Sequence, residues 1–227
     1  MSVSRDALLT IVLIRSFLSM NDIDLSPDLL LRAYASGIFP MGDDRTGEIH
    51  WFAPDPRGIL PLDVFLVPHD VPRLVRKREF RVTSNVAFNQ VIRACADRTR
   101  TWITPSIIAA YTALHQRGYA HSVEAWTDDG TLAGGLYGVA LGGAFFGESM
   151  FYRVSNASKV TLVHLVRQMR AGGHTLLDTQ YTNPHLEQFG VIELPRERYE
   201  ERLEEALCVS PSWWPLSDAE AAAADSP

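Results

Sequence analysis

The change of hydrophobic period near residue 120 constrains the fold of this chain most. Before it, apolar residues recur at helical spacing over residues 86–96, and a second helix is predicted over 104–116. After it, residues alternate with period 2 in three runs, 122–126, 132–141 and 144–152. Only two glycines separate the last two runs, which is typical of a tight hairpin. The sequence therefore predicts an antiparallel meander.

Helices and strands alternate after the meander and indicate a mixed α/β layer architecture. The expected elements are a helix at 157–170, a strand at 175–179, a short helix at 184–189, a strand at 191–194 and a helix at 196–207.

Before the meander, the pattern predicts a helix that begins at Ser26-Pro27 and ends at Gly37. Residues 38–40 and 51–57 are rich in proline and aromatic residues and are predicted to be rigid loops, followed by a strand at 59–67. We divide the chain into an extension (1–23), a small α+β N-terminal domain (24–65), the main domain (66–210) and a frayed acidic tail (211–227).

Composition excludes several classes of protein. The 227 residues are 46% hydrophobic with a net charge of −6, which is ordinary for a globular protein. Cys95 and Cys208 are far apart, so neither a disulfide scaffold nor a thiolate zinc site is expected, and a reducing compartment such as the cytoplasm fits. His115, His121 and Glu124 lack metal-ligand spacing, so we expect no metal and no cofactor.

The N-terminus does not predict a membrane anchor. Its apolar run at residues 7–14 is too short to span a bilayer. Asp6 and Arg15 flank this run and no cleavage site follows, so a signal peptide is not indicated and Met20 is an alternative start.

A basic segment stands out in this acidic chain. Residues 73–100 hold eight basic residues against two acidic ones, a local net charge of +6. Such a run is either a solvated surface or a face for phosphates. The basic residues are Arg73, Arg76, Lys77, Arg78, Arg81, Arg93, Arg98 and Arg100.

Polar residues interrupt three apolar segments. Glu148 lies within an aromatic strand, where a carboxylate is either paired in the core or faces a cleft. Residues 155–159 cap a helix, and their amides with Lys159 could also bind an anion. Asp178 and Gln180 end a strand, and period 2 places them on one face of one cleft.

Several motifs, taken in order, resemble the leucyl/phenylalanyl-tRNA–protein transferase family over residues 24–203. They are R-A-Y (32–34), G-I-F-P-M (37–41), W-F-A-P-D-P-R (51–57), T-W-I-T-P (101–105), H-S-V-E (121–124), G-G-L-Y-G-V (134–139), G-E-S-M (147–150), S-N-A-S-K (155–159), D-T-Q (178–180) and P-H-L (184–186). Thr179 replaces the usual cysteine of D-C-Q, and residues 65–70 depart from the family's F-H-x-S-R-S.

The resemblance implies a GNAT-like (N-acetyltransferase-like) mixed sheet domain preceded by a smaller domain. It also implies transfer of Leu or Phe, and less readily Met, from aminoacyl-tRNA to proteins with N-terminal Arg or Lys, which marks them for N-end rule degradation. We expect a cytoplasmic monomer with no membrane partner.

The resemblance also suggests roles for individual residues. Gln180 would align the acceptor amine, and Asp178 would polarise it or take its proton. Glu148 would face either the cationic acceptor residue or the donor amine. The residues expected to bind substrate are Trp51 and Trp102 (terminal adenine), Phe146, Met150 and Phe151 (Leu or Phe side chain) and Ser158; those expected to bind tRNA are Arg73, Arg76, Lys77, Arg78, Arg81 and Lys159.

Two other functions compete with this hypothesis. An acetyl-coenzyme A N-acetyltransferase would need a glycine-containing turn before the helix at 157, but residues 153–158 contain no glycine. A non-catalytic RNA-binding module would use the basic segment but would leave Glu148, Asp178 and Gln180 without a role.

Overall fold

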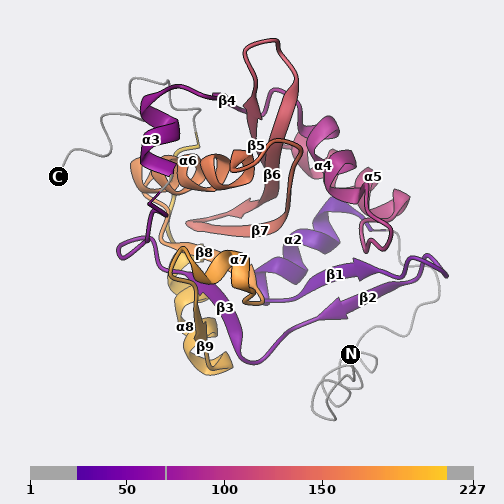
Figure 1. The fold of residues 1–227 in the computed structure, drawn as a ribbon. Helices are drawn as coiled ribbons and strands as arrows, with labels where there is room; N and C mark the ends of the chain where they lie inside the picture. Colours follow the sequence, from indigo (N-terminus) through magenta and orange to yellow (C-terminus); the bar gives the residue numbers. More distant parts are fainter. Residues whose placement is uncertain (1–24, 70, 214–227) are drawn as a thin grey trace.

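The computed structural model describes residues 25–69 and 71–213, where helices pack on both faces of one large sheet (Figure 1). The predicted extension and the alternative start at Met20 lie outside the described residues, as does the tail beyond residue 213. The elements are α2 (Pro27–Ala35), β1 (Phe39–Gly42), β2 (Ile49–Phe52), β3 (Arg57–Leu60), α3 (Val71–Arg76), β4 (Arg81–Ser84), α4 (Phe88–Ala96), α5 (Pro105–Gln116), β5 (Ala120–Trp126), β6 (Leu132–Leu141), β7 (Ala144–Tyr152), α6 (Ala157–Gly172), β8 (Leu176–Gln180), α7 (Pro184–Glu187), β9 (Ile192–Leu194) and α8 (Arg196–Leu207).

The large sheet has the strand order β4-β5-β6-β7-β8-β3-β9 within the described residues. Neighbouring strands are antiparallel except β7 and β8, which run parallel and are connected through α6. A parallel pair needs such a crossover connection. β5, β6 and β7 form the predicted meander, so the α+β class with a mixed sheet is confirmed.

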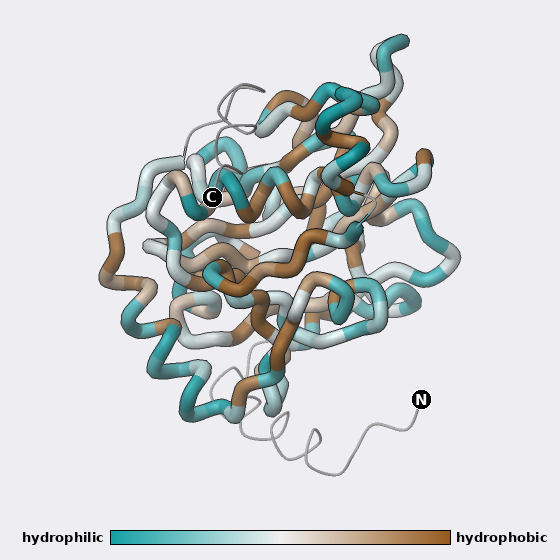
Figure 2. Tube along the Cα trace, turned by 60° about the vertical axis from the view of Figure 1, so that its left-hand side comes forward, coloured by the Kyte–Doolittle hydropathy of each residue, from teal (hydrophilic) through white to brown (hydrophobic). Residues whose placement is uncertain are grey.

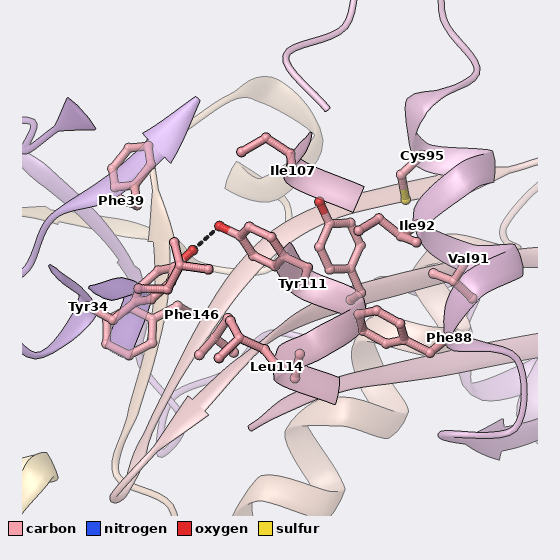
Figure 3. Packing of buried hydrophobic residues seen from close by; sticks show 14 of the residues in the cluster. Tyr34, Phe39, Phe88, Val91, Ile92, Cys95, Ile107, Tyr111, Leu114 and Phe146 are labelled. Carbon is pink, nitrogen blue, oxygen red and sulfur yellow. Dashed lines mark hydrogen bonds between the residues drawn. The ribbon is translucent and has the colours of Figure 1, made fainter. Parts of the chain in front are cut away.

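Alternating side chains of the sheet fill two apolar cores, one on each face. Phe145 and Leu177 belong to the core under α3 and α6. Tyr137, Phe146 and Leu176 belong to the core under α2, α4, α5 and α8, part of which Figure 3 shows. Hydrophobic segments gather in the middle of the molecule, and hydrophilic ones lie on the outside (Figure 2). Neighbouring residues of one strand therefore face different helices.

The predicted loops at 38–40 and 51–57 are wrong in part, because β1 and β2 form an antiparallel two-stranded sheet. Phe39 pairs with Phe52, and their rings stack with centroids 6.0 Å apart. Pro40 is tolerated because each strand of a two-stranded sheet has a free edge.

β3 is shorter than the strand predicted at 59–67 and lies in the large sheet. It pairs with β8 on one side and β9 on the other, and it ends before Pro61. Residues 57–60, which the sequence assigns to the N-terminal domain, therefore supply a strand to the main sheet. The basic segment likewise contains an unpredicted edge strand, β4.

Candidate active site

The parallel pairing of β7 with β8 stops at Phe146 opposite Asp178. Both strands continue beyond that point, and a cavity of about 420 Å³ is lined by the residues that follow. On β7 these are residues 147–150, and on β8 and just after it they are residues 179–181. The cavity thus lies where two parallel strands stop pairing, which is where sheet enzymes commonly bind ligands.

A bulge in β7 sets the direction of the side chains in this region. Tyr137 pairs with Ser149 and Gly138 pairs with Gly147, so Glu148 is the extra residue. A bulge shifts the alternation of side chains by one residue. Met150 consequently packs on the α6 side of the sheet, and Phe151 packs on the opposite side.

The Glu148 carboxylate is bound by two tyrosines. Tyr34 donates to Oε1 at 2.7 Å and Tyr111 donates to Oε2 at 3.2 Å. The two tyrosine hydroxyls also hydrogen-bond to each other, as Figure 3 shows. The residue keeps some exposure through the cavity, while its carboxylate is enclosed by protein.

Enclosure changes the acidity of this group. The pKa of Glu148 is raised to about 7. Burial is the largest cause and the charge of Asp178 adds to it, whereas the hydrogen bonds from Tyr34 and Tyr111 and the charge of Arg57 act in the opposite direction. Burial and the charge of Glu148 raise the pKa values of Tyr34 and Tyr111, so both stay protonated as donors. Near neutral pH, Glu148 can therefore either hold or release a proton.

Asp178 is completely buried and does not line the cavity. Arg57 donates from Nη2 to its Oδ2 at 2.7 Å and from Nε to its Oδ1 at 3.0 Å. Tyr199 donates to Oδ2 at 2.7 Å, and the backbone N–H of Gln180 donates to Oδ1 at 2.8 Å. The expectation that Asp178 reaches the cleft beside Gln180 is therefore wrong. Asp178 lies against Arg57, which is itself 1% exposed, and the positive φ of Gln180 breaks the period-2 relation between Asp178 and Gln180.

Gln180 lines the cavity in an unusual backbone conformation. Its φ of +59° lies in the left-handed region, which residues other than glycine rarely adopt. Its Nε2 atom is buried without a hydrogen-bond partner within the described residues. Backbone strain of this kind persists where the surrounding structure imposes it. Here the hydrogen bond from the backbone N–H of Gln180 to Asp178 restrains the backbone.

One wall of the cavity is aliphatic rather than aromatic. Positions 158, 162 and 165 of α6 fall on one face of the helix, because they are four and then three residues apart. The apolar wall consists of Leu136, Met150, Leu162, Leu165, Leu177 and Leu186.

The other predicted substrate-binding residues divide between the cavity and the core. Trp102, Met150 and Ser158 line the cavity. Phe146 packs against Tyr34 at 4.8 Å, and neither it nor Phe151 lines the cavity. Placing both phenylalanines in the pocket is therefore wrong, because the sheet turns them away from α6.

Trp51 on β2 also lies outside the cavity lining, half-buried against the core of α2, α4, α5 and α8.

The family is decided by comparison with known proteins. Residues 59–204 match the family model described as leucyl/phenylalanyl-tRNA protein transferase, and residues 23–55 match the model of its N-terminal domain. The chain belongs to the leucyl/phenylalanyl-tRNA–protein transferase family.

Curated relatives agree with this assignment. The chain is 70% identical over 204 residues to the leucyl/phenylalanyl-tRNA–protein transferase of Salinibacter ruber, covering 90% of each chain. It is 51% identical over 187 residues to that of Gloeobacter violaceus, covering 82% of this chain and 96% of the relative. Among solved structures, L-PGS from Bacillus licheniformis aligns over 80% of this chain and 62% of its own at 11% identity with a TM-score of 0.38, which is too low to support an argument about the fold.

The predicted tRNA-binding residues lie outside the cavity lining. Arg73 and Arg76 are exposed on α3, which packs on α6 in Figure 1, and Lys77, Arg78 and Arg81 follow them on the surface. The Arg81 guanidinium lies 5.6 Å from the Trp126 ring centroid.

Arg98 and Lys159 lie nearer to the cavity. Arg98 lines it and donates to the carbonyl of Met150 at 2.6 Å. Lys159 follows Ser158 in the first turn of α6.

Sequence reasoning assigned no role to several residues that build this site. Arg57, Tyr34 and His185 each lie within a motif that carries the family resemblance, so their motifs were the available signal. Tyr111 and Tyr199 lie in ordinary helices, and no local pattern marks them.

Residues 25–69 and 71–213 contain neither a candidate metal site nor a candidate membrane-spanning helix. No group of three or more His, Cys, Asp or Glu side chains there could hold a metal ion. No helix of that part is long and apolar enough to cross a membrane.

Proposed function

We propose that this protein transfers Leu or Phe, and less readily Met, from aminoacyl-tRNA to the α-amine of proteins that begin with Arg or Lys. The observation that carries the proposal is the cavity, in which an aliphatic wall faces Glu148 and Gln180 in a chain of this family. The product would enter N-end rule degradation. We further propose that the protein acts in the cytoplasm, where aminoacyl-tRNA is made, and that it is a monomer.

The aliphatic wall suits the transferred side chain. Leu136, Leu162 and Leu165 present flexible apolar groups that can surround either a branched aliphatic chain or a phenyl ring. An apolar pocket discriminates by only about 1–3 kcal/mol per methylene, so Met would be accepted with lower efficiency. Trp102 at the same cavity offers a ring face to the terminal adenine.

Glu148 is the group best placed to accept the proton of the acceptor amine. An α-ammonium has a pKa of about 7.7–8.0, close to the value of about 7 for Glu148, so proton transfer between them is nearly balanced. The neutral amine then attacks the ester carbonyl, the N–C bond forms and the bond from the carbonyl carbon to the ribose oxygen breaks. The proton that the nitrogen loses passes to the ribose oxygen, which leaves as a hydroxyl. Because the donor ester is already activated, positioning supplies much of the rate.

Gln180 would orient the reacting groups, and Asp178 would hold Gln180. The unpartnered Nε2 of Gln180 can donate to the ester carbonyl or to its developing oxyanion. Among the described residues, the hydrogen bonds to the Asp178 carboxylate come from Arg57, Tyr199 and Gln180, so Asp178 would act as an anchor rather than as the base.

The tRNA would reach the cavity over a basic surface. Arg73, Arg76 and the basic residues after them would bind acceptor-stem phosphates without reading sequence, and Lys159 would lie nearer the terminal nucleotide. We also propose that the sheet is GNAT-like. It is a meander whose last strand, β7, pairs in parallel with β8, and α6 connects these two strands.

A transfer assay tests the proposal. Labelled Leu-tRNA is incubated with the protein and a peptide that begins with Arg, and in parallel with its N-acetylated form and with a peptide that begins with Glu. Label should appear only on the free Arg peptide. Transfer to the acetylated peptide, or equal transfer to the Glu peptide, would contradict the proposal.

A further inference from the structure

The cavity wall contains a histidine to which the proposed function gives no role. His185, in the short helix α7, lines the cavity next to Leu186 and Asn183. Its Nε2 atom is buried and has no hydrogen-bond partner within the described residues. A buried polar atom without a partner is uncommon in a protein and suggests a missing ligand.

The surroundings of His185 fix which ring nitrogen carries the proton. Nε2 of Gln188 donates to the carbonyl oxygen of His185 at 2.7 Å, which sets the orientation of the amide. The same amide nitrogen lies 3.4 Å from Nδ1 of His185. Nδ1 therefore accepts, which leaves the hydrogen on Nε2 as a donor.

The ring is also held neutral. Burial and then the positive charge of Lys159 lower the pKa of His185. Phe189 packs against it edge-on, with centroids 5.8 Å apart. The group that His185 meets should therefore be a neutral hydrogen-bond acceptor rather than an anion.

The neighbours of His185 identify the part of the donor that lies beside it. Glu148 is bound to Tyr34 and Tyr111 and acts on the amine, whereas His185 lies near Lys159 at the start of α6. With the acyl side chain on the aliphatic wall and the terminal phosphate toward Lys159, as proposed above, the ribose would lie between them.

We propose that Nε2–H of His185 donates a hydrogen bond to the 2′-hydroxyl of the aminoacylated terminal ribose. This inference rests on the proposed function, because it requires an aminoacyl-tRNA donor. The bond would hold the ribose so that its ester carbonyl faces Gln180, and it would make the enzyme sensitive to the hydroxyl beside the ester.

Two donors test the inference: Leu-tRNA that ends in adenosine and the same tRNA that ends in 2′-deoxyadenosine, each with a peptide that begins with Arg. In the wild-type protein, loss of the hydroxyl should lower kcat/KM about tenfold, because a buried donor then lacks a partner. His185→Phe, which keeps a ring and removes the donor, should be about tenfold slower with the ribose donor and should discriminate between the two donors less than about twofold.

Rescue and control variants separate recognition from folding. His185→Gln, whose side-chain amide can reach the position of Nε2, should recover discrimination between the two donors. Glu187→Gln, an exposed neighbour on α7, should discriminate like the wild type.

The outcomes distinguish this inference from the proposed function. If neither donor gives transfer with the wild-type protein, the proposed function fails. If transfer occurs but the wild type treats both donors alike, or His185→Phe keeps the wild-type ratio, the role of His185 is overturned and the proposed function stands. The wild-type comparison decides the question even if His185→Phe does not fold.

Discussion

Asp178→Asn should damage the stability of the protein as well as its activity. The carboxylate of Asp178 is fully buried and accepts hydrogen bonds from Arg57 at 2.7 and 3.0 Å, Tyr199 at 2.7 Å and the N–H of Gln180 at 2.8 Å. Asparagine leaves the Arg57 cation uncompensated and turns an N–H group toward other donors. Removing one partner of a buried ion pair costs about 3–5 kcal/mol, a large part of the roughly 5–15 kcal/mol that stabilises a typical domain.

Urea unfolding and single-turnover transfer, measured on the same samples, check this. Asp178→Asn should lower the free energy of unfolding by about 3–5 kcal/mol and slow transfer, because Gln180 loses its restraint. Gln180→Asn is the matched control: asparagine tolerates the left-handed backbone, so it should slow transfer while stability changes by less than about 1 kcal/mol.

A second pair of variants asks whether Arg57 and Asp178 act as one unit. Arg57→Met alone should destabilise as strongly as Asp178→Asn, and Arg57→Met with Asp178→Leu should recover part of the loss, because an apolar pair replaces a buried ion pair. If Asp178→Asn unfolds at the same urea concentration as the wild type while its transfer rate falls sharply, the anchor role is refuted and a direct role in proton transfer is favoured.

Further predictions concern Glu148, the aliphatic wall and the basic surface. In the wild type, kcat/KM should rise as Glu148 loses its proton near pH 7, and Glu148→Gln should keep only the inflection of the α-amine at about 7.7–8.0. Since the folded-state pKa of Glu148 is raised, stability should fall as pH rises from its usual range to about 7, and urea unfolding of Glu148→Gln should lack this fall. Leu165→Phe should reduce the space beside the aliphatic wall of the cavity, and it should lower transfer from Phe-tRNA relative to Leu-tRNA by about tenfold in competition assays. Replacing Arg73 and Arg76 with Ala should weaken tRNA binding and reduce the slope of log affinity against log salt by about 1–2.

The sequence was sufficient to predict the helices and strands whose signal is a local pattern. The meander, α6 and α8 were predicted because their period and turn residues lie within a few positions of each other. Two helix caps also follow from local sequence: Ser26 accepts from the N–H of Leu29, and Thr104 accepts from that of Ile107. The cap predicted at the start of α6 differs, because Asn156 at the N-cap makes no side-chain hydrogen bond to the helix. The β1–β2 hairpin was missed because proline-rich, aromatic strands resemble loops until their pairing is known.

The site depended on features without a local signal. Period 2 places Phe146, Glu148 and Met150 on one face, but the bulge at Glu148 moves Met150 to the α6 side. Pairing of Arg57 with Asp178 joins residues 121 positions apart, and neither residue's neighbours predict it. The tyrosines that bind Glu148 likewise come from two helices that are distant in the sequence.

The end of the β7–β8 ladder connects these features. Past Phe146 and Asp178 the two strands no longer pair with each other, so β7 is free to bulge. On its other edge β8 pairs with β3, and this pairing brings Arg57 to Asp178. The bulge directs Glu148 to its tyrosines, and the Arg57–Asp178 pair fixes the backbone of Gln180. A carboxylate and a carboxamide from different strands therefore reach one cavity through two local departures from regular β structure, which is why strand periodicity alone predicts neither side chain's position.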